Sequence, residues 1–250
     1  MSDYSEASVA SIASALNSSQ VPNVLWGHCL LNVYGIPSII ASIDFVLPDN
    51  LLSRGAEALK AIPRLKPCPD PETCLASSEE RYTPPPAFHL HMDTSEITVD
   101  LYLQSETLWF LPTLDDALLC ADASKLPPYF VLASDQDSLP PPRLGRGSGV
   151  FQSSKEAVVV PKAHVLLEAF IRLYARNWGK RIGAFSMAMI AYVEEYVDDD
   201  GFLDTSQLPE PLKAFYFELR EGKKPLRQWA KELRQALGVL GEGSDEEDSY

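Results

Sequence analysis

The chain has 250 residues, 46% of them hydrophobic and 22% charged, which suffices for one globular domain or two small ones. Its net charge of −14 argues against non-specific nucleic-acid binding, which needs a basic surface, but permits a small anionic ligand in a local basic pocket. No apolar run is long enough to cross a bilayer, and the first residues, MSDYSEASVASIASAL, lack the features of a secretory signal. We therefore expect a cytoplasmic protein with reduced cysteines and no membrane partner.

The first half of the chain alternates between helical and strand patterns. Apolar residues recur at helical spacing near the N-terminus, and two β-rich runs flank a short segment that ends at Gly35. Pro48 ends the second run, and an amphipathic segment follows. The pattern predicts a helix over 5–16, a strand over 21–27, helical turns over 28–35, a strand over 36–48 and a helix over 49–62.

The next segment, 63–87, contains seven prolines and predicts a long loop. Alternating residues then predict a hairpin of strands over 88–92 and 96–103, and two further short strands over 109–114 and 129–134. A loop or linker rich in proline and glycine covers 139–149. Helical patterns dominate afterwards, over 158–177, 180–197, 208–222 and 224–238.

These elements predict an α+β protein in three parts. Residues 1–150 form a mixed sheet with flanking helices, and residues 151–240 form a helical half. The end of the chain, 241–250, carries five acidic residues and no basic one, which is typical of a disordered tail.

Two of the predicted strands each carry an aspartate in an otherwise apolar setting. In SIIASIDFVL, strand alternation places Asp44 on the same face as Ser42, and ITVDLYL carries Asp100. Either aspartate alone is explained by hydrogen bonds from a neighbouring loop or by pairing with an arginine. Burying both is costly unless a cation or a set of donors compensates them, and a divalent metal is one such compensation.

The order of these features resembles the nucleotidyltransferase superfamily with the polymerase-β-like fold, in its divergent abortive-infection and minimal antitoxin-type branch. The resemblance is carried by a strand ending at Gly27, the turn at Gly35, the strand with Asp44 and a later strand with Asp100. The helical segment after residue 158 is similar to the helices that follow the family's core.

The resemblance implies a nucleotidyltransferase-like fold that transfers a nucleotidyl group from a nucleoside triphosphate. Asp44 and Asp100 would be the catalytic residues and would hold Mg²⁺. The nucleotide contacts that it implies are Gly27, His28, Ser42, Arg176 and Lys180.

The chain also departs from the family's pattern. The family's paired glycine is Gly27-His28 here, and its first metal carboxylate is Ser42, which offers only a neutral oxygen. Two alternatives therefore stay open. One is a non-catalytic pseudoenzyme that binds a ligand or a protein, and the other is an unrelated α+β domain whose two aspartates are structural.

A second set of residues has the chemistry of a zinc site. His89 and His91 share a strand face, and Cys68 and Cys74 lie upstream, so that together they offer four ligands. The five residues between the two cysteines exceed the usual spacing of about two to four. The spacing therefore favours a polar strand face and two separate loop thiols.

The segment GRGSG, residues 145–149, has the glycines of a phosphate-binding loop. It lacks the Gly-Lys-Ser/Thr ending of a P-loop, and no strand-to-helix transition surrounds it. We therefore expect a flexible linker there.

Overall fold

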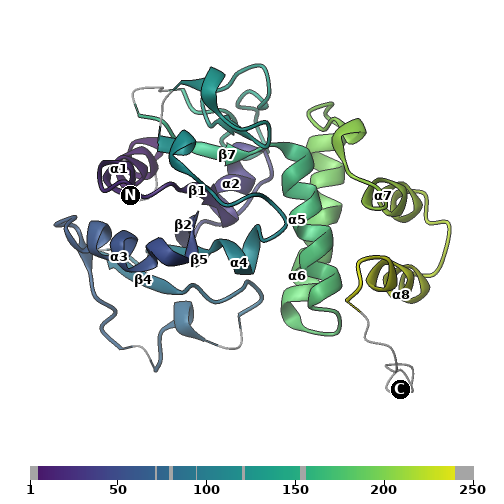
Figure 1. The fold of residues 1–250 in the computed structure, drawn as a ribbon, viewed down its shortest axis with the longest axis horizontal. Helices are drawn as coiled ribbons and strands as arrows, with labels where there is room; N and C mark the ends of the chain where they lie inside the picture. The colour runs from purple at the N-terminus through teal and green to yellow at the C-terminus, as the bar shows by residue number, and fades with distance from the viewer. Residues whose placement is uncertain are drawn as a thin grey trace. The chain divides into compact units, whose positions relative to one another are not determined.

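The computed structural model describes residues 5–70, 72–78, 81–93, 95–119, 122–152 and 156–239 (Figure 1). The chain divides into two compact units, the first ending at Ala163 and the second beginning at His164. The sequence predicts a boundary at residue 150. The structure places the boundary later, because the described residues between 151 and 163 belong to the first unit and not to the helical half. The predicted acidic tail, 241–250, falls outside the described residues.

A five-stranded mixed sheet forms the centre of the first unit. Its spatial order is β1-β2-β5-β4-β3, with β2 and β5 parallel and every other neighbouring pair antiparallel. This confirms the predicted α+β class and its mixed sheet. The strands are β1 (Val24–Trp26), β2 (Ser42–Leu47), β3 (Leu65–Lys66), β4 (Phe88–Met92) and β5 (Thr98–Leu103).

Three helices of this unit lie where the sequence predicts them, and the short α4 is an addition. The Ser5 side chain caps the first helix by accepting a hydrogen bond from the Ser8 amide. The helices are α1 (Glu6–Ser18), α2 (Gly27–Val33), α3 (Leu52–Lys60) and the short α4 (Gln104–Thr107).

The apolar face of the sheet packs against α3. A Cβ atom on Gly55 of α3 would lie 2.9 Å from Leu47 of β2 and 3.3 Å from Leu101 of β5. The missing side chain lets the helix approach the sheet closely, and Leu16 of α1 reaches the same point. The apolar positions of both strands are therefore buried beneath helices, which leaves the opposite face for polar residues.

A second, two-stranded sheet pairs β6 (Phe130–Leu132) with β7 (Val159–Pro161) in antiparallel fashion. The Tyr34 hydroxyl, just after α2, donates a hydrogen bond of 2.7 Å to the Pro161 carbonyl. The predicted helix over 158–177 is thus wrong at its start, where the valine-rich run forms β7. Three consecutive β-branched residues fit a strand better than a first helical turn.

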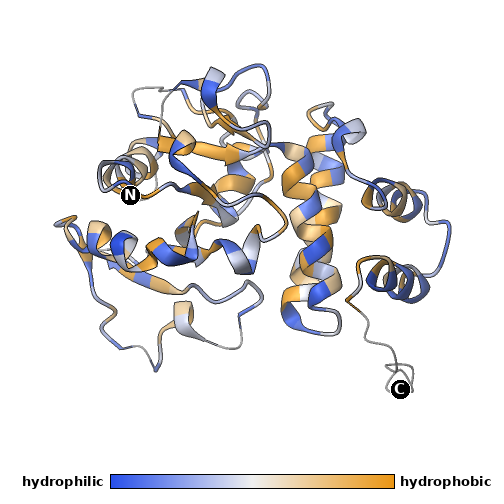
Figure 2. Ribbon diagram, in the orientation of Figure 1, coloured by the Kyte–Doolittle hydropathy of each residue, from blue (hydrophilic) through white to orange (hydrophobic). Residues whose placement is uncertain are grey.

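The second unit is helical, as predicted. In Figure 2, hydrophobic and hydrophilic residues alternate along its first two helices, as expected for helices with one packed face. Trp229 is buried and donates a hydrogen bond of 2.8 Å to the Phe215 carbonyl. The helices are α5 (Ala163–Arg176), α6 (Arg181–Val193), α7 (Leu212–Arg220) and α8 (Leu226–Ala236), with a π-helical turn at Glu194–Asp198.

Two predicted strands need correction. The strand over 36–48 is shorter, since β2 begins at Ser42 and Ile39 is 90% exposed. No strand forms over 109–114, because the Gln104 side chain binds this segment instead. Its amide donates to the Pro112 carbonyl at 2.9 Å, and its oxygen accepts from the Leu114 amide at 3.0 Å. A side chain thus supplies partners that a neighbouring strand would otherwise provide.

None of the helices in the described part of the chain has both the length and the apolar character that a membrane span requires.

The glycine-rich segment 145–149 packs against the end of α2. The Gly147 amide donates to the Gly35 carbonyl at 2.8 Å, and the Gly149 amide donates to the Asn32 carbonyl at 3.0 Å. The prediction of a flexible linker is therefore wrong. The backbone approaches so closely that glycine is the residue that fits at 147.

We expect Gly147→Ala to lower the free energy of unfolding by about 1–3 kcal/mol, as overpacking does in a close-packed interior. The added methyl group would lie 2.6 Å from the Asn32 carbonyl oxygen, a backbone atom that cannot swing away. Chemical denaturation measures the effect. Leu144→Ala is the control, because Leu144 is fully exposed. If both variants unfold like the parent, the packing of this segment is refuted.

Candidate functional site

The two predicted carboxylates lie side by side in the sheet. Asp44 of β2 is the direct partner of Asp100 of β5 in the parallel register. Neighbouring strands lie about 4.7–4.9 Å apart, and paired residues project to the same face. Both carboxylates therefore share one face of the mixed sheet.

A band of polar residues crosses this face from β2 to β4. Ser42 pairs with Thr98, which in turn pairs with His91, while Asp100 pairs with His89. The register thus lines up two rows of polar side chains across three strands. The alternate positions of the same strands are apolar and lie on the helix-covered face.

Both carboxylates are buried, and within the described part of the chain most of their oxygens lack hydrogen-bond partners. Asp44 is 3% exposed and Asp100 is 0% exposed. Among the described residues, no hydrogen-bond partner meets Oδ1 of Asp44 or either oxygen of Asp100. Buried carboxylates normally have such partners, so these three oxygens mark a place where a cation would be stabilised.

One arginine faces the pair. Arg81, from the loop before β4, places Nη1 3.8 Å from Oδ2 of Asp100, a long ion pair. Its guanidinium is held in place by hydrogen bonds to the Ala76 carbonyl (2.6 Å), the Thr83 hydroxyl (3.0 Å) and the Tyr102 hydroxyl (3.3 Å). Sequence reasoning missed Arg81, because it follows two glutamates in a proline-rich loop and resembles a solvated charge.

Burial shifts the titration of both carboxylates. It raises the pKa of Asp44 well above its usual range, and the neighbouring Asp100 adds to the rise, while Ser42 and Arg81 oppose it. Burial likewise raises the pKa of Asp100 to about 6, against the opposing effects of Thr98 and Arg81. The single long ion pair with Arg81 therefore does not compensate the removal of Asp100 from water.

The residues after β1 close over Asp44. Gly27 has φ +61°, and a Cβ atom there would lie 1.8 Å from Oδ2 of Asp44, so no other residue fits. The next residue, His28, makes a hydrogen bond of 2.8 Å between Nδ1 and the Ser38 hydroxyl. Burial and the charge of Arg81 lower the pKa of His28, which favours its neutral form.

A cleft of about 780 Å³ opens beside these residues. Asp100 and Ser42 line the cleft. Asp44 lies beside them, because it follows Ser42 by two residues in β2 and is the direct partner of Asp100 in β5. Arg81 is the one lysine or arginine among the described residues of the lining. The predicted residues Gly27, His28, Ser42, Asp44 and Asp100 thus come together within the first unit.

The other two predicted nucleotide contacts belong to the second unit. Arg176 is the last residue of α5, and Lys180 immediately precedes α6. The structure does not unite them with the carboxylates in one compact unit, so their role stays a prediction.

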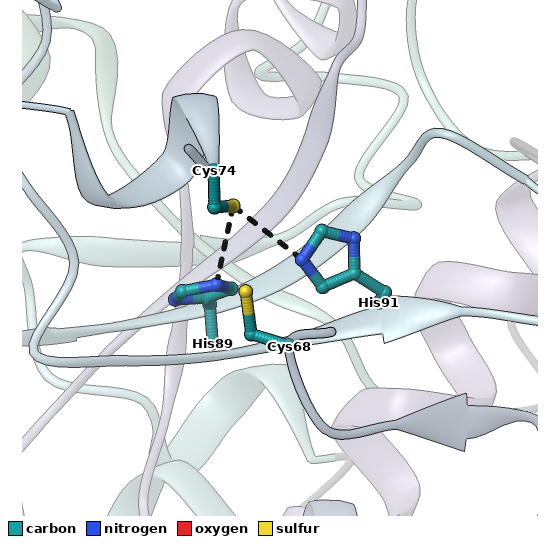
Figure 3. A group of neighbouring side chains, drawn as sticks. All are labelled: Cys68, Cys74, His89 and His91. Carbon is teal, nitrogen blue, oxygen red and sulfur yellow. Dashed lines mark hydrogen bonds between the residues drawn. The ribbon is translucent and has the colours of Figure 1, made fainter. Parts of the chain in front are cut away.

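The four candidate zinc ligands also come together. One ligand atom from each of Cys68, Cys74, His89 and His91 lies within 4.8 Å of the other three (Figure 3). The interpretation that spacing favoured, a polar strand face with two separate thiols, does not describe this arrangement.

Comparisons of the chain with protein-family models, with curated proteins and with solved structures find no significant match. The resemblance to nucleotidyltransferases rests on the motif residues and the order of the elements, and it stays a prediction.

We expect Asp100→Asn to stabilise the metal-free protein at pH 8 by about 3 kcal/mol, the equivalent of a pKa shift from 3.8 to about 6. The folded state binds this proton more tightly than the unfolded chain does. Protonation of Asp100 therefore stabilises the fold below about pH 4, and this contribution is lost as the pH rises through about 6. Asparagine keeps a neutral group at every pH.

Urea denaturation in EDTA at pH 4 and pH 8 measures the difference, which we expect to fall below about 1 kcal/mol at pH 4. Asp122→Asn is the control of opposite sign, because hydrogen bonds from Ser124 lower the pKa of this exposed carboxyl. A variant Asp100→Asn that is less stable than the parent at pH 8 would show that Arg81 already compensates the charge.

Proposed function

We propose that residues 1–163 form a nucleotidyltransferase-like module that binds a nucleoside triphosphate, together with one Mg²⁺, in the cleft beside Asp44 and Asp100. One observation carries the proposal: two buried carboxylates stand in register on neighbouring parallel strands, with three oxygens that lack hydrogen-bond partners. Carboxylate oxygens are the ligands that Mg²⁺ prefers in proteins.

The charge of the cleft supports an anionic ligand only with a cation present. Arg81 is the one lysine or arginine of the described lining, against Asp70, Glu96 and Asp100 in the lining and Asp44 beside it, so a free triphosphate would be repelled. A bound Mg²⁺ would neutralise the carboxylates and accept phosphate oxygens. The cleft volume of about 780 Å³ lies within the usual range for small-molecule sites.

The residues fit one divalent ion, not two. Nucleotidyl transfer with two metal ions requires enough carboxylates to hold both ions. Ser42, which lies on the same face as Asp44 and Asp100, has no carboxylate to offer a second ion. Ser42 offers a neutral oxygen beside Asp44. The roles left to the chain are to hold the carboxylates, to aim Arg81 at the phosphates and to exclude water from the buried end of the cleft.

A second candidate function, ligand binding without transfer, is favoured by this same neutral residue. In that case the module is a pseudoenzyme, and Arg81 and His28 select the ligand by its charge and shape. The two candidates share the binding step and differ only in whether a labelled nucleotidyl group reaches an acceptor.

We expect binding of a non-hydrolysable ATP analogue to require Mg²⁺, and Asp44→Asn or Asp100→Asn to weaken it at least about tenfold, or 1.4 kcal/mol. Isothermal titration calorimetry with and without Mg²⁺ measures this. Asp49→Asn is the matched control, because Asp49 lies just after β2 and its carboxylate accepts from the Ser105 amide instead of lining the cleft. Equal affinity for all three variants would place the ligand elsewhere.

We expect Ser42→Asp to lower the free energy of unfolding by about 2–4 kcal/mol without Mg²⁺, since Ser42 is buried and a third carboxylate adds uncompensated charge. With Mg²⁺ the stability should return, and transfer from α-labelled ATP should rise. Thermal melts and a labelling assay follow the two effects. A loss that Mg²⁺ does not reverse would favour the pseudoenzyme.

A further inference from the structure

Four metal-binding side chains converge on the polar face of the sheet, next to the carboxylate pair. His89 is the direct partner of Asp100 in β5, and Cys74 and His91 line the same cleft as Asp100. In Figure 3 the side chains of Cys68, Cys74, His89 and His91 point toward a common centre. Their ligand atoms all lie within 4.8 Å of one another, and each side chain is half-buried. Two of them come from β4 and two from the loop that precedes it.

The sheet register explains how these residues meet. His89 and His91 alternate along β4, so both project to the polar face. Lys66 of β3 pairs with His91, and the chain continuing beyond β3 therefore brings Cys68 alongside His89. A shift of one residue between β3 and β4 would turn these side chains to the opposite face and separate them.

A tight turn then returns the loop to the same point. The Asp70 carboxylate accepts hydrogen bonds from the Glu72 amide (3.1 Å) and the Thr73 hydroxyl (2.7 Å). This turn folds the chain between the two cysteines and presents Cys74 to the histidines. The long spacing between the cysteines is taken up by the turn, which the sequence alone does not reveal.

Two of the distances are those of a tetrahedral metal site. The Cys74 sulfur lies 3.5 Å from Nε2 of His89 and 3.5 Å from Nε2 of His91. A tetrahedral zinc with Zn–S of about 2.3 Å and Zn–N of about 2.0–2.1 Å separates sulfur from nitrogen by about 3.6 Å. No separation between the ligand atoms exceeds 4.8 Å, so small side-chain rotations suffice to complete the tetrahedron.

We propose that Cys68, Cys74, His89 and His91 bind one zinc ion with structural function. Two thiolates and two imidazoles in tetrahedral arrangement select Zn²⁺ over hard ions such as Mg²⁺, which require oxygen ligands. Four protein ligands also close the coordination sphere, as in structural sites and unlike catalytic ones. Both cysteines are free thiols, available for this role.

The zinc site would fix the loop that carries Arg81. Cys74 immediately precedes a 3₁₀ turn, Leu75–Ser77, and the Ala76 carbonyl in this turn accepts a 2.6 Å hydrogen bond from Arg81. A zinc ion bound to Cys74 would thus fix the position of the 3₁₀ turn whose carbonyl group holds the Arg81 guanidinium beside Asp100. Cys74 and His91 line the same cleft as Asp100, but the zinc proposal does not rest on nucleotide binding, because none of its four ligands is a carboxylate.

Metal analysis of the reduced chain, purified without added metal or chelator, tests the site. We expect one zinc per chain by mass spectrometry of the metal, and a loss of at least about tenfold in occupancy in Cys74→Ser and His91→Ala. Cys29→Ala is the matched cysteine control, because Cys29 is buried elsewhere and donates to the Ser42 carbonyl. Zinc that persists in Cys74→Ser, or is lost equally in Cys29→Ala, would overturn the assignment.

A second measurement does not depend on the folding of any variant. Cobalt added to the metal-free parent should produce the intense visible bands of tetrahedral Co²⁺ and a thiolate charge-transfer band. His91→Cys should retain one zinc and strengthen the charge-transfer band in its cobalt form, since it adds a third thiolate. Octahedral cobalt spectra, or a Cys68–Cys74 disulfide in the freshly purified parent, would refute the proposal.

Hydrogen exchange tests the consequence for the loop. Removal of zinc should speed exchange at the Ser77 and Arg81 amides, which donate to the Cys74 and Ser78 carbonyls, and leave α1 unchanged. Exchange that is unaffected by the metal would show that the loop is held without it.

Discussion

The parallel register between β2 and β5 is the constraint on which the rest of the first unit depends. It places Asp44 directly beside Asp100, and the antiparallel register with β4 then adds His89 to the same row. A shift of one residue in β2 would send Asp44 to the face covered by α3 and α1. The apolar alternate positions exclude that shift, because burying them beneath the helices requires the observed face. Packing on one side thus fixes the chemistry on the other.

As a consequence, the negative charge on the polar face of the sheet is only partly balanced by positive charge and hydrogen bonds. Two buried carboxylates share one nearby guanidinium, which lies 3.8 Å from Asp100, and three of their oxygens have no hydrogen-bond partner among the described residues. Burial accordingly favours protonation, with the pKa of Asp100 at about 6. Structural aspartates normally gain partners from the fold, whereas a ligand site keeps its oxygens free until an ion or substrate arrives. This balance is the physical basis for preferring a binding site over a purely structural pair.

A single loop links the two candidate sites. The segment between β3 and β4 carries both cysteines of the proposed zinc site and also Arg81, and β4 carries both histidines next to Asp100 in β5. A metal at the cluster would reduce the conformational freedom of the loop and so position the arginine in advance. Such a metal would also help to hold this proline-rich segment against the sheet.

The sequence by itself determined the type and face of most elements. Alternation predicted β4, β5 and the face of Asp44, and helical spacing predicted the helices of the second unit. It failed at residues 109–114, where the side chain of Gln104 replaces a strand partner. Only the tertiary structure decided that Asp44 and Asp100 are neighbours, that Arg81 faces them and that two distant cysteines meet two histidines. Local periodicity is written into consecutive residues, whereas register and loop path follow from packing between segments far apart in the chain.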